Sequence, residues 1–188
     1  QRDGIIRGLK NRDTWNKRWH ATMHAPIIKN NYSVSELNTL EHSYLLPSEL
    51  VSKLENYPKK YQPAGEENGW RYLKSFAQKR GFNYHTHISK PTESRIACSR
   101  LSPYFAWGNI SIKQVFQFVG THPNGSTNNR AFSGMLTRLH WHCHFIQKFE
   151  VECTYETLCI NKGYELLEHK KNETFIKAWK TGQTGYPL

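Results

Sequence analysis

The chain has 188 residues and a formal net charge of +11, from 26 lysines and arginines against 15 aspartates and glutamates. This length allows one sizeable hydrophobic core, and the charge favours a polyanionic partner, nucleic acid first. Aromatic residues make up 13% of the sequence, and bases stack on such rings. The alternative is that the charge only keeps the protein soluble and the rings only fill its core.

The cysteines indicate the redox setting of the protein. Cys98, Cys143, Cys153 and Cys159 include no pair with Cys-x-x-Cys spacing. Four thiols without such a framework are typical of a reducing compartment, so we expect a cytoplasmic protein. No apolar run reaches membrane length, and we expect no membrane partner.

The first third of the chain contains one helical pattern and then irregular structure. Apolar residues spaced by three and four predict helix over 5–23, with a break near Asn11–Asp13. Residues 25–63 contain four prolines and several polar clusters. This composition predicts a linker with short helical turns.

The middle of the chain alternates between helices and turns. The spacing predicts a helix over 66–80 that ends at Gly81, and a loop over 82–98. A short helix is expected to start at Pro103 and to end near Gly108-Asn109. Ser111 should then cap a helix over 112–119.

The longest predicted helix, 131–152, follows a loop over 120–130 that is rich in glycine and asparagine. It carries an apolar stripe and, beside it, a stripe of aromatic and cationic residues. The apolar stripe consists of Phe132, Met135, Leu136, Leu139, Cys143, Ile146 and Phe149, and the second of Arg138, Trp141, His142 and Phe145. A last helix is expected over 172–180, and no segment reads as a strand.

The pair Ser102-Pro103 is typical of a helix start, with a hydroxyl cap and a proline at the first helical position. Such a start presents unpaired N–H groups, and with Ser99 and Arg100 nearby it is suited to binding a phosphate. The alternative is an ordinary capped helix. Another candidate site is His140 with His144, one helical turn apart, which could share a metal; we favour a structural or ligand-lining role for them.

The segment 97–108 resembles the Thr-Ser-Arg-Leu-Ser-Pro signature of the photolyase/cryptochrome family, with Cys98 in place of the threonine. Other segments resemble further motifs of that family in the same order. They are Gly65-Glu66, Tyr84 placed seven residues before Pro91, Leu139-His140-Trp141-His142, and the block 178–188. The resemblance is strong over 64–188 and weaker over 1–63.

The resemblance implies an all-α, helical FAD-binding domain preceded by the end of an α/β antenna domain. The implied boundaries are 1–28 for the antenna domain, 29–63 for the linker and 64–188 for the first part of the FAD-binding domain. We therefore expect an internal fragment of a longer protein, and we expect its uncovered apolar surface to favour self-association.

The resemblance also implies a cofactor, a substrate and their residues. FAD is the expected cofactor, with a possible additional antenna pigment, and DNA containing pyrimidine dimers is the expected partner. The residues implied for FAD are Tyr84, Cys98, Ser99, Arg100, Leu101, Ser102 and His142, and those implied for the reaction are Trp141 and Arg138. The implied activity is blue-light-driven repair of the dimers by a photolyase-like lyase.

Two departures from the family's pattern keep other functions open. Arg138 stands where repair enzymes often carry a glutamate, and His142 stands where they usually carry an arginine. One alternative is therefore a cryptochrome-like flavin photosensor without repair activity. A second alternative is a helical nucleic-acid-binding module without a cofactor.

Overall fold

The structure is a computed structural model that describes residues 4–29, 31, 45–58 and 60–186. It divides into two compact units, residues 1–151 and residues 152–188. Every regular element in the described residues is helical, and none of them is a strand. The prediction of an all-α fold is confirmed, whereas the α/β antenna domain and the boundaries after residues 28 and 63 stay predictions.

The N-terminal segment differs from its prediction. Residues 5–10 form turns rather than helix, and the first helix, α1, is Trp15–His24. Gly4 and Gly8 both have positive φ, 76° and 74°, which breaks a helical path on either side of the apolar pair Ile5 and Ile6. The apolar spacing in this segment reflects burial of an irregular chain, since Ile5 is buried.

The predicted linker contains one described helix. α3 (Ser48–Glu55) starts directly after Pro47 and buries none of its side chains. This agrees with the expectation of short helical turns, and residues 32–44 of the predicted linker lie outside the described residues.

The predicted helix over 66–80 is confirmed, as α4 (Glu66–Ser75) and a final π-helical turn, η2 (Phe76–Arg80). The predicted loop over 82–98 is wrong, because this segment forms α5 (Tyr84–His87) and α6 (Pro91–Ala97). Proline at the start of a helix lacks only an N–H that would be unpaired there. Pro91 therefore opens α6, although we interpreted it as a sign of a loop.

Two helices and a 3₁₀ turn precede the longest helix. α7 (Ser102–Ala106) begins one residue earlier than predicted, and its Ser102 makes no capping hydrogen bond. α8 (Ile112–Thr121) begins as predicted, with a capping box in which the Gln114 N–H donates to the Ser111 hydroxyl over 3.1 Å. A 3₁₀ turn, η3 (Pro123–Gly125), follows α8.

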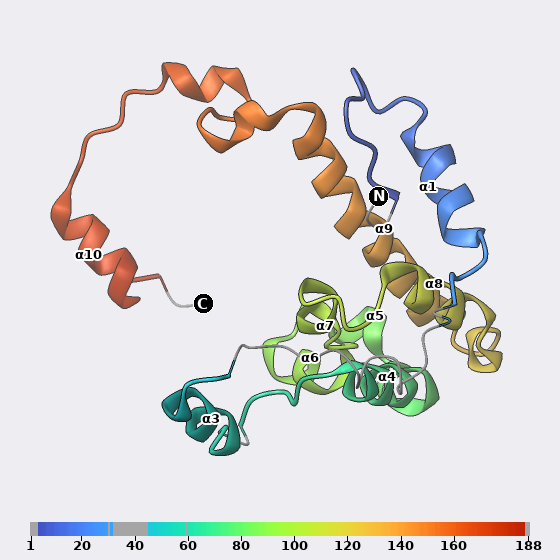
Figure 1. Cartoon of the computed structure of the whole chain (residues 1–188). Helices are drawn as coiled ribbons and strands as arrows, with labels where there is room; N and C mark the ends of the chain where they lie inside the picture. The colour runs from blue at the N-terminus through green and yellow to red at the C-terminus, as the bar shows by residue number, and fades with distance from the viewer. Residues whose placement is uncertain (1–3, 30, 32–44, 59, 187–188) are drawn as a thin grey trace. The chain divides into compact units, whose positions relative to one another are not determined.

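The longest helix, α9 (Asn129–Val151), matches the prediction to within two residues at its start and one at its end. Figure 1 shows it beside α8, and α8 also packs against α1. Its predicted apolar stripe is correct for the first four turns, but Ile146 and Phe149 are exposed. Gln147 is fully buried in their place.

Gln147 fastens the N-terminal segment to α9. Its side-chain amide donates to the Ile6 carbonyl over 2.9 Å, and its side-chain oxygen accepts from the Ile6 N–H over 2.7 Å. This reciprocal pair satisfies both buried polar ends of the side chain. These two hydrogen bonds hold residues 5–10 in place, although this segment forms no helix or strand.

The second unit contains two 3₁₀ turns, η4 (Cys153–Glu156) and η5 (Lys162–Leu166), and the helix α10 (Glu173–Thr181). The prediction of a helix over 172–180 is confirmed: Asn172 caps it through the Phe175 N–H, and Gly182 ends it in the left-handed conformation with φ of 72°. None of the described residues of this unit is buried.

The described helices include none that is both long enough and apolar enough to cross a membrane.

Candidate cofactor site

A cavity of about 530 Å³ in the first unit is bounded by α5, α6, the segment 98–102 and one face of α9. We call it the serine cavity. Its lining residues are Gln62, Tyr84, Ile88, Ser94, Arg95, Cys98, Ser99, Arg100, Leu101, Ser102, Phe105, Met135, Arg138, Leu139 and His142. All seven residues expected to bind FAD are among them, together with Arg138.

The backbone of the serine segment is held in an unusual conformation. Arg100 has φ of 61° and is the only residue other than glycine with positive φ in the described chain. Its carbonyl accepts from the Gln62 side-chain amide over 2.9 Å, and its guanidinium donates to the Gln62 side-chain oxygen over 3.1 Å. Because a left-handed residue of this size carries strain, these two bonds compensate for it and fix the turn between Ser99 and Ser102.

A second arginine fixes the start of the same segment from behind. The Arg80 guanidinium donates to the carbonyls of Cys98, over 2.8 Å, and of Tyr72, over 3.0 Å. It also donates to the Ile96 carbonyl and to the Ser75 hydroxyl. Arg80 therefore ties η2 and α4 to the end of α6, and this places Cys98 and Ser99 at the edge of the cavity.

The two serine hydroxyls are available to a ligand. Neither Ser99 nor Ser102 makes a side-chain hydrogen bond to any other residue in the part of the chain that is described. The predicted capping role of Ser102 is wrong, because Leu101 occupies the cap position of α7. With five residues, α7 has only a small dipole, so the hydroxyls and nearby cations carry the argument for an anion site.

The charge of the cavity is uniformly positive. Arg95, Arg100 and Arg138 all line it, and none of the described lining residues is acidic. Charge-assisted hydrogen bonds from arginine to phosphate oxygens are stronger than neutral ones and are often bidentate. The lining is therefore suited to a ligand that carries phosphate groups.

Tyr84 supplies a neutral phenol to the floor of the cavity. Burial, strengthened by the nearby Cys98, raises the pKa of Tyr84 to about 12, against the opposing charge and hydrogen bond of Arg138. Burial also raises the pKa of the Cys98 thiol, and the charge of Arg80 opposes that shift. Both groups remain protonated at neutral pH, so they present hydrogen-bond donors and add no negative charge.

Arg138 connects the serine cavity to Trp141. Its guanidinium lies 4.7 Å from the centre of the Trp141 ring, in cation–π geometry, and it opposes the rise in the pKa of Tyr84. Trp141 itself does not line the cavity, and its side chain is 46% exposed. The structure therefore places Trp141 at the rim, one helical turn beyond Arg138.

Some lining residues were missed by sequence reasoning. Arg95 and Gln62 were not identified because neither belongs to a motif, and Gln62 reaches the site from a distant segment. Met135 and Leu139 were assigned only to the apolar core stripe. A signal was available for these two, because Leu139 lies one turn and Met135 two turns before His142 on the same helix face.

His140 and His144 lie at the contact between α9 and α1 rather than in the serine cavity. His140 is 2.8 Å from the Asn16 side-chain oxygen, and the Arg12 guanidinium is 3.0 Å from the His144 ring. The His140 ring also stacks on His20 at 5.9 Å. Within the described residues, these side chains belong to no group of three or more potential metal ligands.

Comparison with known proteins shows what the sequence of this chain is similar to. Residues 135–188 match the model of a family described as the FAD binding domain of DNA photolyase. The chain is 27% identical to a deoxyribodipyrimidine photo-lyase of Alkalihalophilus pseudofirmus over 126 aligned residues. The alignment covers 66% of this chain and 25% of the photo-lyase. No solved structure matches the chain.

These findings define a flavin-binding, helical protein, with FAD as the cofactor of the matched domain. Over part of its length the chain is similar to the photolyase/cryptochrome family. The match includes the α9 wall of the serine cavity, with Arg138 and His142, and the segment 84–102 lies before it. The chain spans about a quarter of the length of the photo-lyase it resembles.

Proposed function

We propose that the protein takes part in FAD-dependent, blue-light-driven repair of pyrimidine dimers in DNA, with the serine cavity as its cofactor site. One observation carries this proposal: residues predicted from separate motifs, Tyr84, residues 98–102, Arg138 and His142, line a single positively charged cavity. Residues brought together from separate helices in this way are typical of a ligand site.

The lining fits FAD at both ends of that molecule. The hydroxyls of Ser99 and Ser102 would donate to the diphosphate, and the guanidiniums of Arg100 and Arg95 would neutralise its charge. The apolar side chains of Leu101, Phe105, Met135 and Leu139 would pack against its rings. Tyr84 and His142 would contact the cofactor from the α5 and α9 sides.

Bound FAD supplies the absorption of light and the electron; the chain binds it, orients the damaged DNA and excludes water. Trp141, exposed at the rim, would stack on a dimer that has been flipped out of the duplex. Arg138 would contact phosphates or base edges there. The net charge of +11 supports attraction of the DNA backbone.

A photosensor without repair is the second candidate, and a specific contact favours it. The Arg138 guanidinium already covers one face of the Trp141 ring. A flipped base would have to displace Arg138 or use the other face of the indole. A protein that never receives a base at Trp141 would keep this contact undisturbed.

Illumination of the reduced, FAD-loaded protein with a dimer-containing oligonucleotide tests the proposal. We expect thymines to be restored in proportion to the light dose. Trp141→Ala should weaken binding of the damaged oligonucleotide about ten- to a hundredfold, since base stacking contributes about 1–3 kcal/mol. Binding of undamaged DNA should change little. Bound, reduced flavin with no restored thymine would contradict repair and favour the photosensor.

Two remaining expectations belong to the same proposal. A cytoplasmic location stays a prediction from the cysteine pattern. Self-association also stays a prediction, and the exposed apolar side chains of α9, Phe145, Ile146 and Phe149, support it.

A further inference from the structure

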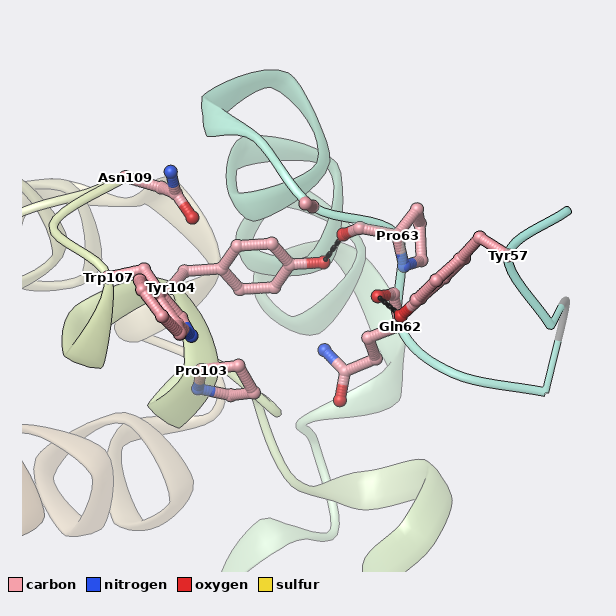
Figure 2. A pocket seen from close by; sticks show the side chains of 8 residues that line it. Tyr57, Gln62, Pro63, Pro103, Tyr104, Trp107 and Asn109 are labelled. Carbon is pink, nitrogen blue, oxygen red and sulfur yellow. Dashed lines mark hydrogen bonds between the residues drawn. The ribbon is translucent and has the colours of Figure 1, made fainter. Parts of the chain in front are cut away.

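A second cavity, of about 420 Å³, lies between two segments of the first unit. It shares only one lining residue, Gln62, with the serine cavity. We call it the aromatic cavity. Figure 2 shows its lining, which consists of Tyr57, Gln62, Pro63 and Ala64 from one segment and Pro103, Tyr104, Trp107 and Asn109 from the other. The volume is within the range of small-molecule sites.

The walls of the aromatic cavity are fixed by the chain itself. Tyr104 is 2% exposed, and its hydroxyl donates to the Pro63 carbonyl over 2.7 Å, joining the two segments. The Tyr57 hydroxyl donates to the Gln62 carbonyl over 3.0 Å. Because Pro63 and Pro103 also restrict the backbone, the cavity is preformed. Little binding free energy would therefore be lost in ordering the cavity walls when a ligand binds.

The opposite sides of the cavity carry exposed aromatic rings. Trp107 is 85% exposed, although Tyr104 and Phe105, three and two residues before it in α7, are buried. Tyr57 is 46% exposed, and Figure 2 places it across the cavity from Trp107. An indole that is left in water beside a hollow offers a large face to a planar ligand.

The polar groups of the cavity are amides rather than charges. The Asn109 backbone N–H donates to the Tyr104 carbonyl over 2.9 Å, and its carboxamide has no hydrogen-bond partner among the described residues. None of the described lining residues is charged. The site is therefore suited to an uncharged, planar ring whose edge carries both hydrogen-bond donors and acceptors. Adenine has such an edge, and an asparagine carboxamide can form two hydrogen bonds with it.

We propose that the aromatic cavity binds an unstacked nucleobase, with Trp107 stacked on its face and Asn109 hydrogen-bonded to its edge. Adenine is the base that asparagine matches with two hydrogen bonds. The base can come from a single strand of nucleic acid, which the charge of +11 would attract, or from a free nucleoside. This site is distinct from the FAD site and from Trp141, so it does not depend on repair activity.

Binding of adenosine and of a short single-stranded oligodeoxyadenylate to the whole chain tests this proposal. Trp107→Ala should weaken binding about ten- to a hundredfold, the effect expected for loss of one stacked base. Trp107→Phe, which keeps an aromatic face, should restore most of the affinity. Asn109→Leu should reduce the preference for adenosine over uridine without abolishing binding.

Trp179→Ala is the matched control, because Trp179 is 75% exposed and belongs to the second unit. Circular dichroism of each variant checks the fold, and Trp107 is exposed enough for its removal to leave the fold intact. Loss of adenosine binding with Trp107→Ala supports a nucleoside site, and loss confined to the oligonucleotide supports a base within a strand. The proposal is overturned if neither probe binds, if Trp107→Ala changes neither affinity, or if Trp179→Ala weakens both equally.

Discussion

The two compact units differ in what specifies their helices. In residues 1–151, side chains from α1, α4, α8 and α9 share one buried core, which includes Trp19, Leu73, Val115 and Leu139. In residues 152–188, none of the described side chains is buried, yet α10 begins at a capping asparagine and ends at a left-handed glycine. Long-range packing therefore specifies the first unit, and local signals specify the helix of the second.

The residues that match the photolyase model and the residues of the buried core lie mostly in different parts of the chain. The match to the model of the photolyase domain covers residues 152–188 of the second unit and, in the first unit, the part of α9 from Met135 onward. Most residues of this match therefore lie in a unit in which none of the described side chains is buried. Substitutions in the two units should separate these properties.

The largest effect on stability is expected for a tryptophan of the first unit. Trp19 is fully buried, and Trp19→Ala should lower the free energy of unfolding by about 3–5 kcal/mol through lost contacts and a new cavity. Trp179→Ala, in the second unit, should change it by less than about 0.5 kcal/mol. Urea unfolding of both variants measures the difference. Similar losses at the two sites would show that the second unit has a buried core as well.

A smaller effect is expected from the buried amide of α9. Gln147→Leu keeps the volume of the side chain and leaves the Ile6 N–H and carbonyl unpaired, so it should cost about 1–3 kcal/mol. Hydrogen exchange at the Ile6 amide should become faster by a corresponding factor. An unchanged exchange rate at Ile6 would mean that Gln147 does not hold the N-terminal segment.

Removal of a helix cap should have different consequences in the two units. Ser111→Ala, at the start of α8, should lower the unfolding free energy of the first unit by about 0.5–2 kcal/mol. Asn172→Ala should instead reduce the helix content of α10 and leave the unfolding of the first unit unchanged. Circular dichroism and urea unfolding distinguish these outcomes. A cooperative loss of stability with Asn172→Ala would contradict the independence of the second unit.

The smallest effect is expected from the histidines between α9 and α1. Burial and the charges of His20 and His144 lower the pKa of His140 from 6.5, and burial with Arg12 and Lys148 lowers that of His144. In weak acid the folded state then binds fewer protons at these two histidines than the unfolded chain does. Their contribution to the free energy of unfolding is therefore fully present above pH 6.5 and is lost as the pH falls through the lower pKa values of the folded state.

The melting temperature of the first unit should therefore decrease modestly from neutral pH into weak acid. The decrease should be less steep in His140→Gln and His144→Gln. Equal slopes in these variants and in the unmodified chain would assign the pH dependence to other groups.

The sequence predicted the elements that are encoded locally. The cap at Ser111, the extent of α9 and the helix over 172–180 were all predicted from neighbouring residues. The failures are residues whose partners are distant. The irregular segment 5–10 depends on Gln147, and the serine segment depends on Gln62 and Arg80. Such contacts leave no periodic pattern, so only the structure identifies them.

The grouping of the candidate FAD residues was predictable from motif order alone, whereas the shape of their cavity was not. Arg100 in the left-handed conformation and Ser102 inside the helix rather than at its cap both follow from packing. Pro91 was misinterpreted for a related reason, because a proline marks a loop and a helix start equally well.

The central claim is that the serine cavity holds the diphosphate of FAD. The most direct test is the affinity of the Ser99→Ala/Ser102→Ala variant for FAD. Each hydroxyl hydrogen bond to a charged group contributes about 1.5–3 kcal/mol, so the double variant should bind FAD at least about a hundredfold more weakly. Ser126→Ala, whose hydroxyl donates to Pro123 away from the cavity, is the control and should bind normally. An unchanged affinity in the double variant, measured by quenching of flavin fluorescence, would contradict the account.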